Sequence, residues 1–169
     1  MLQDLYNNAD TSLKAQGASW YREAGERCAQ LAAEHGTSVQ IAAGVVAALS
    51  PRMPWSSNLR LAGLVLAGQR HGCLQASLDK ASKIIEGADP LVVLSGPKTN
   101  AFYRALIGDF DAVVVDVWML RALGHNKNAC TPRQYEVFAD TIRNAALEAG
   151  ETPADFQAIV WCAIRGKAE

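Results

Sequence analysis

The sequence of 169 residues predicts an all-α fold of about nine or ten helices. Apolar residues recur at helical spacing through most of the chain, and capping residues and glycines separate these segments. The run of β-branched residues at 112–115 is too short and has no second strand-like run to pair with. The apolar content of 50% is ample for one buried core, so we expect residues 1–169 to form a single compact domain.

Helices in the first half of the chain are predicted between glycine and proline breaks. Residues 39–49 are apolar nearly all round, which is typical of a helix buried on every side. Ser19 is expected to cap the helix over 20–35. Thr37 with Gln40 forms the pattern of a capping box for the helix over 39–49. Ser56 or Ser57 is expected to cap the helix that follows. The predicted helices are 3–15, 20–35, 39–49, 58–70 and 77–86.

The stretch from Leu94 to Gly124 organises the rest of the chain. Gly96-Pro97 is a turn signal, because glycine reaches positive φ freely and proline starts a helix well. A helix is predicted from Lys98 to a left-handed cap at Gly108. Buried extended chain at 112–115 then places Asp116 at the start of a helix over 117–123.

Two Thr-Pro pairs mark the starts of the last two helices. Thr131 followed by Gln134 forms a capping box with proline at the first helical position. Thr152-Pro153 repeats the device, and apolar residues follow each pair at helical spacing.

Charge and composition limit the classes of function. The net charge is −1, so any nucleic-acid contact must come from a local patch. No apolar run is long enough for a membrane span and no secretory signal pattern begins the chain, so we expect a cytoplasmic protein. We also expect a monomer. The four cysteines are widely scattered, and the three histidines are isolated from one another. We therefore expect no metal and no cofactor.

The segment LSGPKTNAFYRAL…VVVDVWMLRALG resembles the core of the helix-hairpin-helix (HhH-GPD) DNA glycosylase superfamily, of the endonuclease III type. That family has a hairpin LPGVGxxTA followed by VDTHVxRVxxRLG. The resemblance extends to AALSPRMPWSSN, KASKII and QAIVWCAIRG, so it spans most of the chain. It implies a compact all-α fold with a shortened hairpin. The four closely spaced cysteines of the iron–sulfur loop in many relatives are absent, so no cluster is expected.

The resemblance implies two catalytic residues. Asp116 stands where the family has the acid that stabilises the cationic sugar and activates the nucleophile. Asp116 is also a favoured helix cap, and the two roles are compatible. Lys98 matches the lysine that forms a Schiff base in bifunctional relatives if the two missing residues precede it. If the alignment is anchored on Gly96 instead, that position falls on Asn100, and Lys98 is only a surface charge.

The resemblance also implies contacts with DNA. The hairpin lacks the family's second glycine and proline removes a donor, so its backbone phosphate grip is weakened. The SPRMPWSSN loop corresponds to the segment that fills the gap left by a flipped base. It could equally be a proline-rich corner with its tryptophan in the core. The expected DNA contacts are Gly96, Pro97, Thr99, Asn100, Arg52, Met53, Trp55 and Asn58.

Two aromatic residues are expected to line the pocket for the base. Trp118 replaces the histidine that the family carries two residues after the aspartate, which widens the apolar wall. Tyr21 and Trp161 are either core residues or part of this wall.

Three functions follow from the resemblance. The first is a DNA glycosylase that flips a base and cleaves its N-glycosidic bond through Asp116, resembling the compact versions without a cluster found in phages and prophages. The second is a phage-type transferase that modifies hypermodified thymine on the same fold. The third is a catalytically silent module that binds DNA or protein. The expected location is the cytoplasm of a bacterial or phage-infected host cell.

Overall fold

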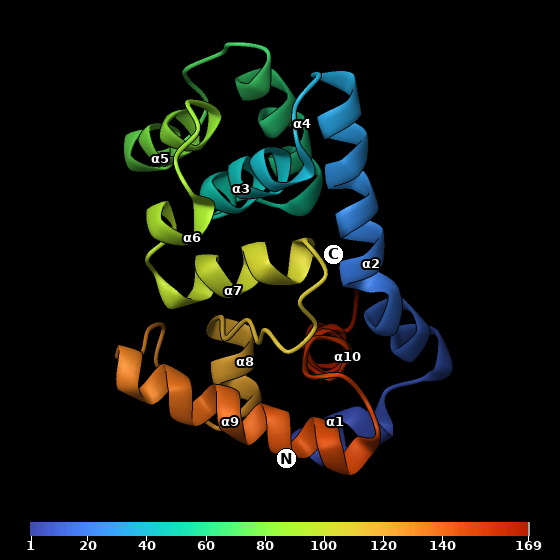
Figure 1. Cartoon of the computed structure of the whole chain (residues 1–169). Helices are drawn as coiled ribbons and strands as arrows, with labels where there is room; N and C mark the ends of the chain where they lie inside the picture. Colours follow the sequence, from blue (N-terminus) through green and yellow to red (C-terminus); the bar gives the residue numbers. More distant parts are fainter. Residues whose placement is uncertain (169) are drawn as a thin grey trace. The chain divides into compact units, whose positions relative to one another are not determined.

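The computed structural model describes residues 1–168, which form helices and connecting segments without any strand (Figure 1). The all-α prediction is therefore confirmed, and so is the predicted number of helices. None of the helices in this part of the chain is both long and apolar enough to cross a membrane. The ten helices are α1 (Leu2–Asn8), α2 (Thr11–Glu34), α3 (Val39–Leu49), α4 (Trp55–Leu66), α5 (Gln75–Ile85), α6 (Pro90–Val93), α7 (Pro97–Leu106), α8 (Val117–Ala122), α9 (Pro132–Ala149) and α10 (Pro153–Arg165).

The helices belong to two compact units. Unit 1 consists of Met1–Glu23 together with the chain from Gly108 onward, and unit 2 consists of Ala24–Ile107. The division falls inside α2, so that helix supplies its first half to unit 1 and its second half to unit 2.

Unit 2 is built around α3. This helix packs against α4, α5, α6 and α7, and its residues 42–49 are all buried (Figure 1). An apolar surface on every side of the helix requires this arrangement, because each face must be covered. The prediction of a central buried helix over 39–49 is confirmed.

Unit 1 is built around α10. This helix packs against α1, α8 and α9, and its centre is buried from Ala154 to Val160 (Figure 1). Its core also includes Val113 and Val115 of the extended segment and Met119 of α8. The buried extended segment therefore ties the start of α8 into the core of unit 1.

The predicted cap at Ser19 is wrong. The break between the first two helices lies at Ala9 and Asp10, and Ser19 lies within α2. The physical reason is local: the carboxylate of Asp10 accepts the N–H of Leu13 at 2.8 Å, as an N-cap side chain does.

The predicted cap of α3 and the predicted start of α4 are also wrong. Ser38, one residue after Thr37, caps α3 by accepting the N–H of Ile41 at 3.1 Å. Helix α4 begins at Trp55 because Pro54 takes the extended N-cap conformation, so no serine caps it.

The predicted starts of α8, α9 and α10 are confirmed. Asp116 caps α8, and Thr131 and Gln134 form the complete capping box at α9. Thr152 caps α10 by accepting the N–H of Asp155 at 3.2 Å. These starts were predictable because each is a local contact between residues two or three positions apart.

Candidate functional site

The carboxylate of Asp116 lies at the centre of the candidate site in unit 1. Its Oδ1 accepts the backbone N–H groups of Trp118 at 3.0 Å and Met119 at 2.9 Å. Its Oδ2 accepts the indole N–H of Trp161 from α10 at 2.9 Å. The side chain is half-buried. Three N–H donors therefore orient one partly accessible carboxylate.

Tyr135 of α9 fixes the chain that leads to this carboxylate. Its hydroxyl donates to the carbonyl of Val113 at 2.7 Å and accepts the N–H of Val115 at 3.1 Å. Burial raises the pKa of Tyr135 to about 12, although its bond with the Val115 N–H acts in the opposite direction. The extended segment thus finds its backbone partners in a side chain, since no strand of the described chain pairs with it.

The two tryptophans that donate to Asp116 each have an arginine against their ring. The guanidinium of Arg121 lies over the ring of Trp118, 4.6 Å from its centroid. The guanidinium of Arg165 lies 4.1 Å from the ring centroid of Trp161 and 5.8 Å from that of Trp118. We call these four side chains the Trp–Arg cluster: Trp118, Trp161, Arg121 and Arg165. The indole N–H of Trp161 links this cluster to the carboxylate.

Tyr21, an expected wall of the base pocket, is only 4% exposed. Its hydroxyl donates to Oε1 of Gln157 at 2.7 Å, and its ring packs edge-on against Trp20 at 5.0 Å between centroids. Burial, and then the charge of Asp116, raise the pKa of Tyr21 well above its ordinary value. Tyr21 is therefore a core residue whose pKa is affected by the charge of Asp116.

The predicted hairpin is the turn between α6 and α7 in unit 2. The side-chain amide of Asn100 donates to the carbonyls of Leu91 at 3.3 Å and Leu94 at 3.1 Å, and so closes the turn. Thr99 donates through its hydroxyl to the carbonyl of Gly96 at 3.2 Å. Gly96 has φ −69°, so the expected use of positive φ at this turn is wrong. The turn is closed by side chains instead.

Lys98 and Pro97 are exposed on the first turn of α7. Lys98 is therefore accessible to a ligand.

The SPRMPW loop lies against the hairpin helix within unit 2. The ring of Trp55 packs edge-on against Phe102 of α7, with 6.3 Å between centroids. Arg52 is exposed with φ 59°, a left-handed conformation that a non-glycine residue rarely adopts. Met53 is half-buried beside it. The structure thus brings together two segments that the sequence separately indicated as DNA contacts.

Asn58 lies in the interior of α4 and is only 1% exposed. It does not cap the helix, whose N-cap is Pro54. Its Oδ1 is buried without a hydrogen-bond partner among the described residues. Asn58 is therefore too buried in this conformation to contact DNA directly.

Sequence reasoning missed Arg165 and the bond between Trp161 and Asp116. Trp161 and Arg165 are four residues apart on α10, a spacing that places both on one helix face. That spacing was the available signal. The spacing does not predict that Trp161 bonds to Asp116, because 45 positions separate the two residues.

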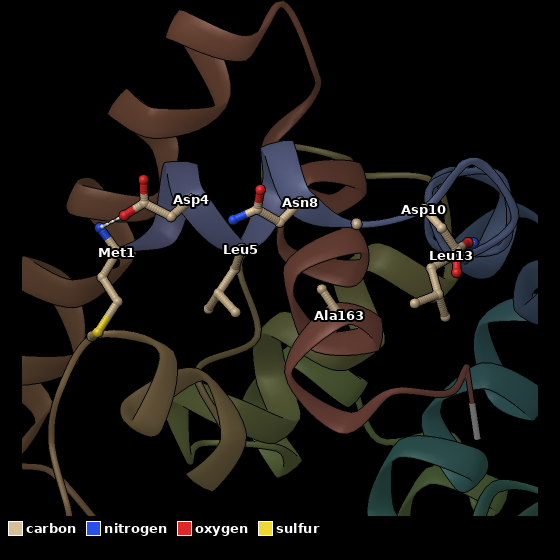
Figure 2. Close-up of a pocket in the computed structure, with 8 residues that line it drawn as sticks. Met1, Asp4, Leu5, Asn8, Asp10, Leu13 and Ala163 are labelled. Atoms are coloured by element: carbon tan, nitrogen blue, oxygen red, sulfur yellow. Dashed lines mark hydrogen bonds and ion pairs between the residues drawn. The ribbon is translucent and has the colours of Figure 1, made fainter.

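A cavity of about 320 Å³ occurs in unit 1 beside α1 and contains none of the predicted site residues (Figure 2). Leu5 and Leu13 line it together with Ala163 of α10, and its polar residues include Asp4 and Asp10. The amino group of Met1 pairs with Asp4 at 2.9 Å (Figure 2). The carboxylate of Asp4 thus already has a cationic partner.

Comparison with known proteins gives one result. A family model described as "Family of unknown function (DUF7178)" matches residues 1–168. No curated protein and no solved structure matches the chain.

Proposed function

We propose that this chain, which belongs to the family of unknown function DUF7178, is a DNA glycosylase-like enzyme that acts on a flipped base through Asp116. The observation that carries the proposal is the setting of this carboxylate. Three N–H donors hold it at the start of α8, and Trp118 and Trp161, which supply two of these donors from backbone and indole, each have an arginine against their ring. Fixed charge beside flat apolar surfaces is what cleavage of a base from its sugar requires.

The hydrogen bonds leave Asp116 capacity to act. A carboxylate offers about four acceptor sites, and three N–H donors occupy three of them. The remaining site can accept a proton from water. In the proposed reaction the bond between C1′ and the base nitrogen breaks, and its electron pair leaves with the base. Asp116 stabilises the cationic sugar, water oxygen bonds to C1′, and the water proton passes through Asp116 to the departing base.

The rings near Asp116 suit an unstacked base. A base that leaves the duplex loses stacking worth a few kcal/mol, and aromatic side chains replace part of it. Trp118 and Trp161 are both half-buried, so part of each ring remains accessible. Trp20 lies next to Trp161, with 6.3 Å between ring centroids.

The charge distribution supports DNA contact through unit 2. Residues 24–107 contain eight basic and five acidic residues, a balance of +3 within a chain of net charge −1. Arg52 and Lys98 are exposed on the loop and hairpin of this unit. This positive balance supports DNA contact through the loop and hairpin of unit 2.

Lys98 is the candidate nucleophile for a second reaction, the formation of a Schiff base with the sugar. The amide of Asn100 is engaged with two carbonyls of the turn, which leaves Lys98 as the accessible nitrogen of the hairpin. If Lys98 is a nucleophile, its amine displaces the base at C1′ and the opened sugar forms a Schiff base, which borohydride reduces to a stable adduct. If it is only a phosphate contact, no adduct forms.

The test is mass spectrometry of base release from oligonucleotides with damaged, mismatched and hypermodified bases. We expect release by the unaltered chain and none by Asp116→Asn, which keeps the cap but removes the charge. The matched control Arg133→Gln changes an exposed residue of unit 1 outside the Trp–Arg cluster and should retain release. An adduct that forms with borohydride and disappears in Lys98→Ala identifies a lyase.

Other outcomes overturn the proposal in distinct ways. A base that gains mass while staying attached identifies a transferase acting on modified thymine. Binding to DNA without any product identifies a silent binding module, in which Asp116 serves only as the cap of α8.

A further inference from the structure

Two arginines of unit 1 converge on one indole without a carboxylate partner. The guanidinium carbons of Arg121 and Arg165 lie 4.6 Å and 5.8 Å from the ring centroid of Trp118. Among residues 1–168, neither guanidinium forms an ion pair or a hydrogen bond with a protein group. Two positive charges beside one indole, without a carboxylate to balance them, favour a bound anion.

The lack of a partner is not explained by a shortage of acids. By sequence, unit 1 contains twelve acidic and eight basic residues. Two other arginines of the same unit are paired: Arg22 forms two bonds to Asp155 at 2.8 Å and 3.0 Å, and Arg143 bonds to Asp140 at 2.7 Å. Arg133 has no such bond among the described residues, but no indole lies against its guanidinium either. The two arginines of the Trp–Arg cluster therefore differ from these neighbours within a unit rich in acids.

Stacking prepares these arginines to bind. A guanidinium held over an indole has fewer conformations to lose on binding, and its N–H edge remains available. That edge matches the oxygens of a phosphate group, which accept two parallel N–H bonds. Arg121 is exposed and Arg165 half-buried, so both can reach a ligand from solvent.

We infer that Arg121 and Arg165 together bind a phosphate group of a nucleic-acid strand. The inference rests on the proposed function, because it places that phosphate beside the nucleotide whose sugar meets Asp116. The link between the two is structural: Trp161 stacks on Arg165 and donates to Asp116 at 2.9 Å. The cluster thus couples the strand's backbone to the carboxylate.

The first test is a salt titration of binding to a fluorescein-labelled single-stranded oligonucleotide, followed by anisotropy. We expect Arg121→Gln and Arg165→Gln each to weaken binding about tenfold at low salt. In the double variant the slope of log K against log salt should fall by about 0.7, since one phosphate contact is lost. Arg133→Gln is the control, because Arg133 is also exposed in unit 1 but lies outside the cluster.

A second measurement covers the case in which a variant is misfolded. In the unaltered chain, the side-chain Nε–H resonances of Arg121 and Arg165 should shift together when the oligonucleotide is added. Inorganic phosphate should shift them only at much higher concentration. Equal responses to both ligands, or an unchanged slope in a folded double variant, overturn the inference.

The failures of the two proposals are distinguishable. If the unaltered chain releases a base but the double variant keeps its salt slope, the glycosylase proposal stands and the phosphate site is rejected. If the unaltered chain releases no base but the double variant has a reduced salt slope, the phosphate site stands and the glycosylase proposal is rejected.

Discussion

The indole N–H of Trp161 donates to Oδ2 of Asp116 at 2.9 Å and joins two residues that lie 45 positions apart. Through this bond, α10 holds the side chain that caps α8. The carboxylate is consequently fixed from two directions, by the backbone of α8 and by a ring from the centre of unit 1. Removal of the ring's donor and removal of the carboxylate should therefore have separable effects.

Trp161→Phe tests the contribution of this bond to stability. The phenyl ring retains most of the packing, but the hydrogen bond to a charged acceptor is lost. We expect the free energy of unfolding to fall by about 1–2 kcal/mol, measured by urea denaturation. Trp118→Phe is the matched control, because no hydrogen bond from its indole to a described residue occurs. Equal losses in both variants would show that the bond contributes nothing.

Substitutions at Asp116 separate capping from chemistry. Asn retains an oxygen that can accept the N–H groups of Trp118 and Met119, whereas Ala retains none. We expect Asp116→Ala to lose about 1 kcal/mol more stability than Asp116→Asn, as measured by denaturant unfolding. Both variants should lack base release. Release by Asp116→Asn at an undiminished rate would limit Asp116 to its structural role.

Sequence patterns predicted the features that depend on near neighbours. The caps at Asp116, Thr131 and Thr152 each bond within three residues, and the burial of α3 follows from its composition alone. Ser19 failed as a cap because Asp10, nearer the break, performs that role. Where two capping residues compete, the sequence alone does not rank them.

Features that depend on distant neighbours could not be predicted in this way. The Trp–Arg cluster combines α8 with α10, and Tyr135 of α9 holds the segment before Asp116. The division into two units also left no signal, because its first boundary lies inside the continuous helix α2. A linker rich in glycine or proline marks many boundaries, but a helix that crosses one does not.

Gly17→Ala tests the close approach of α2 and α10 in unit 1. An added Cβ would lie 2.5 Å from Cα of Ile159 and 2.7 Å from its backbone N, so backbone atoms would have to move. We expect a loss of more than about 2 kcal/mol in the free energy of unfolding. Gly63→Ala is the control: its Cβ would meet Leu31 at an ordinary 3.5 Å, so a gain of up to about 1 kcal/mol is expected. Similar values for both would contradict the packing argument.

Asn100→Ala tests whether this side chain closes the hairpin. Loss of its bonds to the carbonyls of Leu91 and Leu94 should loosen the α6 turn without unfolding unit 2. We expect hydrogen exchange of the amides at 91–94 to become about fivefold faster, corresponding to about 1 kcal/mol. Lys98→Ala, a change at an exposed position on the same helix, should leave these rates unchanged. Unchanged exchange in Asn100→Ala would place the closure of the turn elsewhere.

Tyr135→Phe tests the side chain that supplies partners to the extended segment. The variant leaves the N–H of Val115 and the carbonyl of Val113 without this hydroxyl, at a site where Tyr135 is 5% exposed. We expect the free energy of unfolding to fall by about 2 kcal/mol near neutral pH.

The advantage of Tyr135 over Phe should depend on pH in one direction. Its pKa is about 12 in the folded chain and near 10.0 when exposed, so unfolding favours loss of its proton. The stabilisation is complete below about pH 10 and is lost as pH rises toward about 12, by up to about 3 kcal/mol. Urea unfolding of both chains at about pH 8 and pH 11.5 should show the difference shrinking. A difference independent of pH would contradict the buried hydroxyl.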